Sequence, residues 1–437
     1  MKKFLFLFSL FVPFLLPAQD KQQFLIRAGK LFDSESGQFK KGVSILVKYN
    51  IIQEVREDRE PSVEEKKNYT LIDLRAYTVL PGLIDAHTHL LYREEIHPGN
   101  NLPGLDLDKV LTMDGDAYRA IYGAARAKAY LEAGITAVQD LGNSGQFADV
   151  ALRRAINEGL VPGPRMRCAG PGLSTEGGQV PGLIFKHREI VNDEYRIVKG
   201  PEDAVQAVRE NINQGADVIK IYSNNTPNNT RLSTEEIRAI VKEAHLYGLR
   251  VTAHATDNKA VYNAVISGVD GIEHGYQVDD STLELMAKKG VILVPTDGDS
   301  ISLRQYLKLS SMSEKEIADQ LAWDRKFLGD RLQRAVKKGV MIAAGSDDYV
   351  DFKLPFAEPS IRTLIGYVES GIPIPRVLQF ATLNGSSQLN WSNKIGKIKR
   401  GYLADIIAVD DDLEKNIQSI LSVRFVMKDG KIFLNKL

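Results

Sequence analysis

The sequence predicts an α/β fold, a (β/α)8 barrel (TIM barrel) joined to a small composite β-sandwich domain built from both ends of the chain. Between residues 78 and 395, eight short apolar segments alternate with helical segments at a steady spacing. Residues 19–77 and 396–437 instead alternate apolar and polar side chains, as half-buried antiparallel strands do. A chain of 437 residues with 43% hydrophobic content is long enough for one barrel-sized domain and a smaller one.

The predicted barrel strands follow one another along the middle of the chain. They are residues 78–89, 135–142, 165–170, 217–223, 250–256, 269–275, 291–296 and 340–348. The helices predicted between them include residues 116–133, residues 146–158, a segment that opens near Pro201, and residues 233–247, which STEE begins as a capping box. A doubly wound sheet would need a glycine-rich phosphate-binding turn after an early strand, and the sequence contains none. Catalytic groups are therefore expected where the barrel strands end.

Residues 1–18 have the three-part pattern of a secretory signal peptide. Lys2 and Lys3 precede an apolar run, and small or neutral residues lead to Ala18, after which cleavage is expected. The run is shorter than the about 20 residues that span a bilayer, so no stable membrane insertion is expected after cleavage. An uncleaved anchor is the alternative. The protein is therefore predicted to be periplasmic or secreted.

The composition excludes several classes of partner and site. Basic and acidic side chains number 56 each, so the net charge is zero and no field favours nucleic acid or an anionic membrane. The single cysteine, Cys168, excludes an intrachain disulfide and a thiolate metal cluster. We expect it to be a buried core residue. The composition leaves open whether the chain forms an oligomer.

Six polar residues fall at predicted strand ends. Alternate side chains of a strand share a face, so His87 and His89 point the same way. The other residues of this set are Lys220, His254, His274 and Asp347. Each alone has a simpler explanation, as a polar strand end, a turn cap or a lysine that keeps its charge in water. Together at one rim of an apolar barrel they predict a metal site, because histidine is the commonest metal ligand.

Lys220 indicates the kind of metal site. It interrupts the apolar strand DVIKIY, where desolvation disfavours an ammonium group and favours loss of its proton. A neutral amine can combine with carbon dioxide to form a carbamate, whose two oxygens would bridge two metal ions. An N-carboxylated Lys220 is the hypothesis that follows from this position.

These residues resemble the metal-dependent amidohydrolase superfamily over about residues 26–437. The likeness rests on motifs in the family order, which are PGLIDAHTH, GITAVQDLG, GADVIKIYS, AHA, GIEHG, GSD and GYLADIIAVD. The chain is most similar to the imidazolonepropionase-related and prolidase-like (Xaa-dipeptidase) branch, whose binuclear members cleave dipeptides at the carboxyl end. The resemblance implies a split β domain packed on the barrel and two divalent metal ions, with zinc (Zn2+) expected.

The resemblance also implies a ligand set by position. The more buried ion would be held by His87, His89 and Asp347. The second ion would be held by His254 and His274, with carboxylated Lys220 as the bridge between the two.

The mechanism expected from such a site uses two Lewis acids. A water shared by two cations loses its proton near neutral pH, and the metal-bridging hydroxide attacks a carbonyl that one ion polarises. Asp347 is expected to be catalytic, moving the proton from the nucleophile to the leaving amine. The adjacent Asp348 is expected to be structural.

The predicted function is therefore that of an exported binuclear amidohydrolase that cleaves an amide, preferably in a dipeptide, as a prolidase or carboxypeptidase does. The alternative chemistry at the same metal pair is hydrolysis of a cyclic amide, a lactone or a phosphoester ring, or deamination. A different class is a non-catalytic barrel that binds a metal or a surface. Asp347 argues against that class, because a structural metal site needs no base.

Candidates for contact with a small-molecule or dipeptide substrate lie in loops near the strand ends. They are Gln179, His187, Arg188 and Tyr222. Arginine binds a carboxylate in a bidentate way, although an ordinary loop or core role is favoured for the last three of these residues. Gln179 stands where many prolidase-like relatives have histidine, and a second such histidine is missing from YVDFKLPFAEP. We expect His97 and His245 to be ordinary loop and helix-surface residues.

Overall fold

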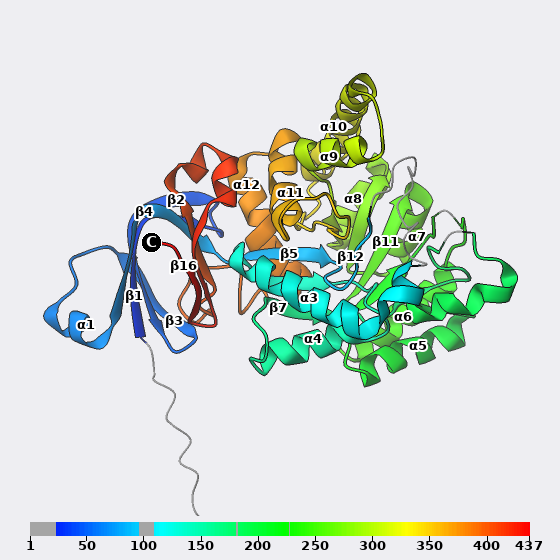
Figure 1. Cartoon of the computed structure of the whole chain (residues 1–437), viewed down its shortest axis with the longest axis horizontal. Coiled ribbons are helices and arrows are strands. Elements are labelled where there is room, and N and C mark those ends of the chain that lie inside the picture. The colour runs from blue at the N-terminus through cyan, green and yellow to red at the C-terminus, as the bar shows by residue number, and fades with distance from the viewer. Residues whose placement is uncertain (1–22, 96–108, 181, 227) are drawn as a thin grey trace, which may run out of the picture.

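The computed structural model describes residues 23–95, 109–180, 182–226 and 228–437. The predicted signal peptide with its cleavage site, and His97, lie outside these ranges. Figure 1 shows a mostly β part, formed by both chain ends, beside a larger α/β part. Within the described ranges, no helix is both long and apolar enough to cross a membrane.

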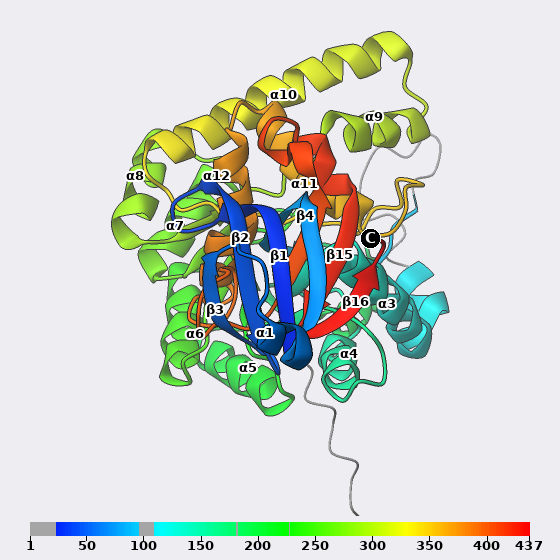
Figure 2. The same ribbon diagram turned by 90° about the vertical axis from the view of Figure 1, so that its left-hand side faces the viewer.

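Strands from both ends of the chain form a single seven-stranded sheet. Its order is β16-β15-β14-β4-β1-β2-β3, and neighbours are antiparallel except β1 and β4. The bounds are β1 Gln23–Asp33, β2 Gln38–Lys48, β3 Ile51–Glu57, β4 Thr70–Pro81, β14 Ile406–Asp410, β15 Val423–Lys428 and β16 Lys431–Asn435. Because β14 pairs with β4, the C-terminal strands complete the sheet that the N-terminal strands begin (Figure 2).

The first predicted barrel strand, residues 78–89, is two strands in the structure. β4 continues to Pro81 in the terminal sheet, past the predicted domain boundary at residue 77, and β5 covers Leu83–Thr88. Gly82 lies between them. A Cβ at Gly82 would lie 2.1 Å from Oγ1 of Thr136, so this close approach requires glycine.

The α/β part contains two parallel sheets, with the strand orders β13-β12-β11-β10-β8-β9 and β5-β6-β7. Their other bounds are β6 Ile135–Asp140, β7 Arg165–Cys168, β8 Gly172–Ser174, β9 Tyr195–Ile197, β10 Ile219–Tyr222, β11 Val251–Asp257, β12 Gly271–Gln277 and β13 Ile292–Val294. Each predicted barrel strand before residue 340 therefore has a counterpart. β8 and β9 are additional strands.

The eighth predicted strand, residues 340–348, is not a regular strand, so that prediction is wrong. Isolated bridges join the segment to β13 on one side and to the end of β5 on the other. The amide of Asp347 donates to the carbonyl of His87 at 2.9 Å, but a φ of +55° at Asp347 ends the extended conformation. The segment therefore lies between the two parallel sheets. A closed ring of eight strands stays a prediction.

The described ranges contain one short helix between β3 and β4, and helices that follow most of the parallel strands. They are α1 Val63–Asn68, α3 Gly115–Glu132, α4 Ala148–Asn157, α5 Pro201–Asn213, α6 Thr234–Leu246, α7 Asn258–Ser267, α8 Asp280–Lys289, α9 Ser300–Leu309, α10 Glu314–Lys337, α11 Glu358–Glu369, α12 Ile374–Gln379 and α13 Gly385–Gln388. Shorter or differently wound turns are η1 Val110–Asp114, η2 Phe185–Asp193, η3 Phe380–Asn384, η4 Asp411–Glu414 and η5 Ile417–Leu421. The predicted capping box is confirmed, because Ser233 and Glu236 each bond the other's backbone amide.

β14 joins the two parts by packing on a different core with each face. Ile406 and Ala408 lie in the core of the terminal sheet, whereas Ile407 and Val409 lie in the larger core of the α/β part. Figure 2 shows the terminal sheet in front of the helices of the α/β part. Cys168 is fully buried in the larger core, as predicted.

We expect Gly345→Ala to lower the free energy of unfolding by about 1–3 kcal/mol, because it overpacks the contact between the residue 340–348 segment and β5. The new Cβ would lie 2.4 Å from Cγ1 of Val294 and 2.8 Å from Cβ of His87. Gly298→Ala is the matched control, since no atom lies within 4 Å of its added Cβ. Urea unfolding of both variants measures the difference. Equal stability of the two variants would contradict the close approach.

Candidate metal centre

Three side chains converge beyond the end of β5. Nε2 of His87 lies 3.2 Å from Nε2 of His89, and Oδ1 of Asp347 lies 3.3 Å and 3.1 Å from these two nitrogens. One ligand atom from each residue lies within 4.8 Å of the others, so a single ion can contact all three. Imidazole nitrogens with a carboxylate oxygen suit zinc and similar divalent ions.

The second ring nitrogen of each histidine has its own partner. Nδ1 of His87 donates to Oε2 of Glu273 at 2.7 Å, and Nδ1 of His89 donates to the carbonyl of Gly142 at 2.8 Å. A neutral imidazole that donates from Nδ1 keeps its lone pair on Nε2. The two Nε2 lone pairs therefore face the carboxylate of Asp347, as metal ligands would.

Glu273 is not among the site residues that the sequence predicts. It is fully buried, and the hydroxyl of Thr252 donates to its other oxygen. Adjacent side chains of a regular strand point to opposite faces, which would separate Glu273 from His274. The φ of +73° at His274 breaks that alternation, and both side chains contact His87. The sequence signal for Glu273 is an acidic residue in an apolar strand.

Burial keeps the histidines neutral. Desolvation lowers the pKa of His87, His254 and His274 well below 6.5, because a buried imidazolium loses its hydration. The charge of Lys220 lowers all three pKa values further. Neutral imidazole is the form that binds a metal ion.

Lys220 and Glu273 are a buried amine and a buried carboxyl near the same centre. Lys220 lies on β10 with a relative exposure of 1%, and burial lowers its pKa, against the charges of Glu273 and Asp347. Burial raises the pKa of Glu273 to about 7, against the charge of Lys220. Desolvation therefore shifts both groups toward their neutral forms.

His274 and His254 pack beside the three convergent residues. The ring centre of His274 lies 5.2 Å from that of His87 and 4.6 Å from that of His254. Nδ1 of His274 lies 2.8 Å from Oγ1 of Thr296, which itself donates to the preceding carbonyl. That hydroxyl therefore accepts from Nδ1, and Nε2 of His274 keeps its lone pair. Nε2 of His254 instead faces the side-chain amide of Gln179 at 3.0 Å.

Asp347 is the member of the cluster that opens onto a cavity. Its side chain is 18% exposed and lines a cavity of about 230 Å³. Burial acts to raise its pKa, but interactions with His87 and His89 hold the pKa of this carboxyl below its usual value. An ionised carboxylate therefore stands at the boundary between the buried histidines and the space open to a substrate.

Two other aspartates hold the surrounding segments in place. Asp85 on β5 accepts hydrogen bonds from the amides of His87 and Ser346, at 3.1 Å and 3.0 Å. Asp348 is buried and accepts from the hydroxyl of Tyr130 at 2.9 Å, which fits the structural role expected of it. Both carboxylates fix the backbone on either side of Asp347.

The four predicted substrate contacts divide into two groups. Tyr222 is 3% exposed, and its ring centre lies 5.3 Å from that of His254, which Gln179 also contacts. His187 and Arg188 are exposed on η2, and Arg188 donates to a neighbouring backbone carbonyl. The structure therefore places Tyr222 and Gln179 at the centre, whereas His187 and Arg188 face solvent.

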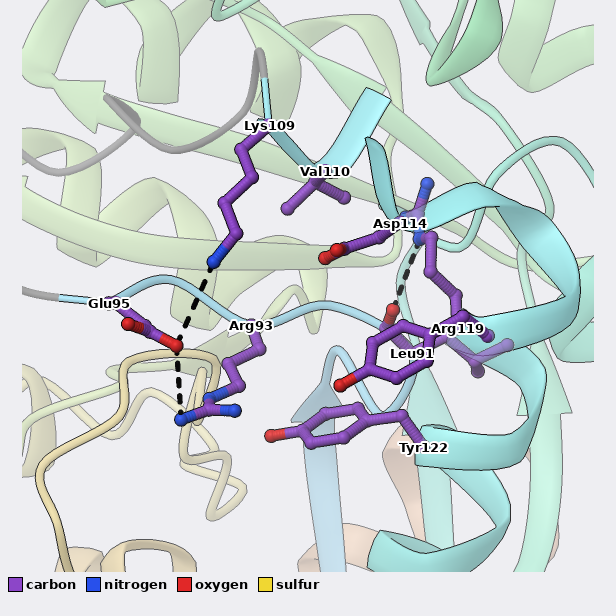
Figure 3. A pocket seen from close by; sticks show the side chains of 9 residues that line it. Leu91, Arg93, Glu95, Lys109, Val110, Asp114, Arg119 and Tyr122 are labelled. Carbon is purple, nitrogen blue, oxygen red and sulfur yellow. Dashed lines mark hydrogen bonds and ion pairs between the residues drawn. The ribbon is translucent and has the colours of Figure 1, made fainter. Parts of the chain in front are cut away.

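A separate polar cavity lies at the start of α3 (Figure 3). Glu95 pairs there with Arg93 at 3.4 Å and with Lys109 at 3.8 Å, and Nε of Arg119 donates to the carbonyl of Leu91 at 3.2 Å. None of the six predicted metal ligands is among its nine lining residues. Glu95 therefore pairs with two cations of this cavity, whereas Arg119 pairs with Glu194, which is not among the lining residues.

Comparisons with known proteins give consistent results. The model described as Amidohydrolase family matches residues 78–433. Ochratoxinase from Aspergillus niger is 26% identical over 397 residues, which cover 82% of this chain and 76% of that protein. An imidazolonepropionase from Kosmotoga olearia is 23% identical over 390 residues, which cover 84% and 86% of the two chains.

A solved structure, that of a Xaa-Pro dipeptidase with methionine bound in the active site, is 30% identical with a TM-score of 0.79. The alignment covers 94% of this chain and 99% of that one. The family match includes all six residues that the sequence predicts as metal ligands. The chain therefore belongs to the amidohydrolase family and is a hydrolase that acts on carbon–nitrogen bonds.

Proposed function

We propose that the chain hydrolyses the amide bond of a dipeptide or a dipeptide-like substrate, with divalent metal ions bound at the cluster around Asp347. The observation that carries this proposal is the convergence of two Nε2 lone pairs and one carboxylate, with each Nδ1 already bonded elsewhere. The similarity to a Xaa-Pro dipeptidase supports the substrate class. The ionised carboxylate at the cavity wall supplies the base that amide hydrolysis needs.

We assign the donors of this cluster to two ions. His87, His89 and Asp347 would hold the first ion, His254 and His274 the second, and Lys220 as a carbamate would bridge them. The depressed pKa of Lys220 supports carboxylation, because the neutral amine is the form that reacts with carbon dioxide. Nε2 of His254 faces Gln179, so its use as a ligand atom requires that amide to turn away.

Zinc is the ion we propose, and when bound it polarises a carbonyl oxygen and acidifies water. Asp347 accepts a proton from the attacking water as the new carbon–oxygen bond forms. The same carboxyl then protonates the amine nitrogen as the carbon–nitrogen bond breaks. Glu273 keeps His87 in its Nδ1-protonated tautomer and fixes the orientation of the ring.

We also propose that the enzyme is exported and that its parallel strands close into a barrel. The N-terminal pattern of lysines, an apolar run and Ala18 supports export. The bridges from the residue 340–348 segment to β13 and β5 support closure on that side of the sheets.

A panel of dipeptides and N-acyl amino acids, assayed with metal content measured on the same preparation, tests the proposed function. We expect turnover of at least one dipeptide, two bound ions per chain, and loss of activity when a chelator removes them. Hydrolysis of cyclic amides or lactones without any cleavage of dipeptides would replace the proposal with ring opening.

Lys220→Met removes the amine and keeps most of the side-chain volume. We expect loss of at least one bound ion and a fall in kcat/KM of more than about 100-fold, since the bridge is missing. Lys428→Met is the matched control, because Lys428 is also a buried lysine with a pKa lowered by burial, but it lies in the terminal sheet. Two ions retained by Lys220→Met would count against the carbamate bridge.

His254→Gln should make the stability of the metal-free protein less dependent on pH. The folded pKa of His254 lies well below 6.5, so the unfolded chain gains a proton that the folded chain does not as the pH falls through 6.5. Stability is therefore lost on acidification, and between pH 7.5 and 5.5 the wild type should lose about 1.4 kcal/mol more than the variant.

Urea unfolding between pH 7.5 and 5.5 measures this loss. His245→Gln is the control, because His245 is exposed on α6, as predicted, and pairs with Asp270 at 2.9 Å. Identical losses for the wild type and His254→Gln would show that His254 is not held neutral by burial.

A further inference from the structure

The cavity that begins at Asp347 extends between α9, α10 and the residue 346–352 segment. Its volume is about 230 Å³. Apolar side chains form much of its wall, among them Leu303 of α9, Leu328 of α10 and Phe352. A substrate bound with its scissile carbonyl beside Asp347 therefore has an apolar space open to one of its side chains.

Four charged residues line this cavity, and three of them have strong partners. Asp347 belongs to the histidine cluster. Asp348 pairs with Arg126 at 3.1 Å. Arg325 donates to two backbone carbonyls, at 2.6 Å and 3.1 Å, and lies 3.5 Å from Glu369.

Asp324 is the remaining charged residue. The hydrogen bond that the structure shows for its carboxylate comes from the neutral amide of Gln320 at 3.3 Å. Burial raises the pKa of Asp324, and the charge of Arg325 opposes that shift only in part. Within the described ranges, this half-buried carboxylate has no ion-pair partner within 4.0 Å. A carboxylate partly removed from water gains most from a cation brought into contact with it.

The hydroxyl of Ser302, also in the wall, lacks a hydrogen-bond partner among the described residues. Ser302 lies on α9 and is 4% exposed. A buried hydroxyl without a partner costs about 1–3 kcal/mol. Because Oγ of Ser302 has almost no accessible surface, Asp324 is the acceptor of the wall that a ligand rich in N–H donors can reach.

We propose that this cavity binds a cationic substrate side chain, an ammonium or guanidinium group at the end of an aliphatic stem, with Asp324 as its ion-pair partner. The inference rests on the proposed amide hydrolysis and adds the substrate class. The methylene groups of a lysine or arginine pack against Leu303, Leu328 and Phe352 while the charged end reaches the carboxylate. The neutral side chain of norleucine, one atom shorter than that of lysine, fills most of the same space without the ion pair.

Kinetics on matched dipeptides tests this assignment. The substrates are Ala-Lys against Ala-norleucine and Lys-Ala against norleucine-Ala, with the wild type, Asp324→Asn and the control Asp319→Asn, an exposed residue of the same helix. We expect the wild type to prefer lysine over norleucine in one pair by at least about tenfold in kcat/KM. Asp324→Asn should reduce this ratio to near one, chiefly by lowering kcat/KM for the lysine substrate. Asp319→Asn should keep the wild-type ratio.

A wild-type ratio near one in both pairs, or an unchanged ratio in Asp324→Asn, overturns the subsite and leaves amide hydrolysis standing. If no dipeptide is cleaved, the proposed function fails, and calorimetry with L-lysine and L-norleucine decides the subsite alone. Selective binding of L-lysine that Asp324→Asn loses supports the subsite. Equal binding of the two amino acids, or none, overturns it.

Discussion

The centre of this protein depends on the buried carboxylate of Asp85. Its oxygens accept hydrogen bonds from the amides of His87 and Ser346 and from the hydroxyls of Ser346 and Ser360. These bonds connect β5, the residue 340–348 segment and α11 through the single side chain of Asp85. Burial raises the pKa of Asp85 to about 6, and the hydrogen bonds oppose that rise. The carboxylate is therefore ionised at neutral pH, the state in which it can accept all four bonds.

The electrostatics of the site follow from burying several ionisable groups together. Burial lowers the pKa of Lys220 and raises the pKa of Glu273, which favours the neutral form of each group. The charge of each group shifts the pKa of the other in the opposite direction. His87, His254 and His274 stay neutral under the same desolvation, and Asp347 is the ionised member of the cluster that lines the cavity. A metal ion entering the site meets lone pairs and negative charge without first displacing protons from the imidazole rings.

Much of the fold could be predicted from the sequence, because its signals are local. Apolar runs mark the strands, and the STEE motif fixes the start of α6. The irregular conformation of residues 340–348 could not be predicted, because their apolar pattern is typical of a strand. In the structure, Ser346 donates its amide and hydroxyl to the side chain of Asp85, and these bonds compete with backbone pairing in a sheet. The break between β4 and β5 at Gly82 could not be predicted, because it depends on a contact with Thr136, far along the chain.

The site shows the same division. His87, His89 and Asp347 were predictable because each follows an apolar segment, and parallel strands bring such ends together. Glu273 was not predictable, because side chains that alternate along a regular strand would place it on the face opposite His274. The positive φ at His274, which changes this, is known only from the structure. Asp324 lies on α10, which contributes no predicted strand end, so only the folded chain shows that it faces the cavity.

The pairing of β14 with β4 has a consequence for how the chain matures. β4 leads through Gly82 into the strand that carries His87, yet its neighbour on one side is not synthesised until after residue 405. Contacts so distant in sequence form slowly, because a long loop must close before they stabilise the fold. During translation, β4 therefore lacks one of its two neighbours when the strand that carries His87 is made. Only synthesis of residues 406–410 supplies β14 and completes the support of β4.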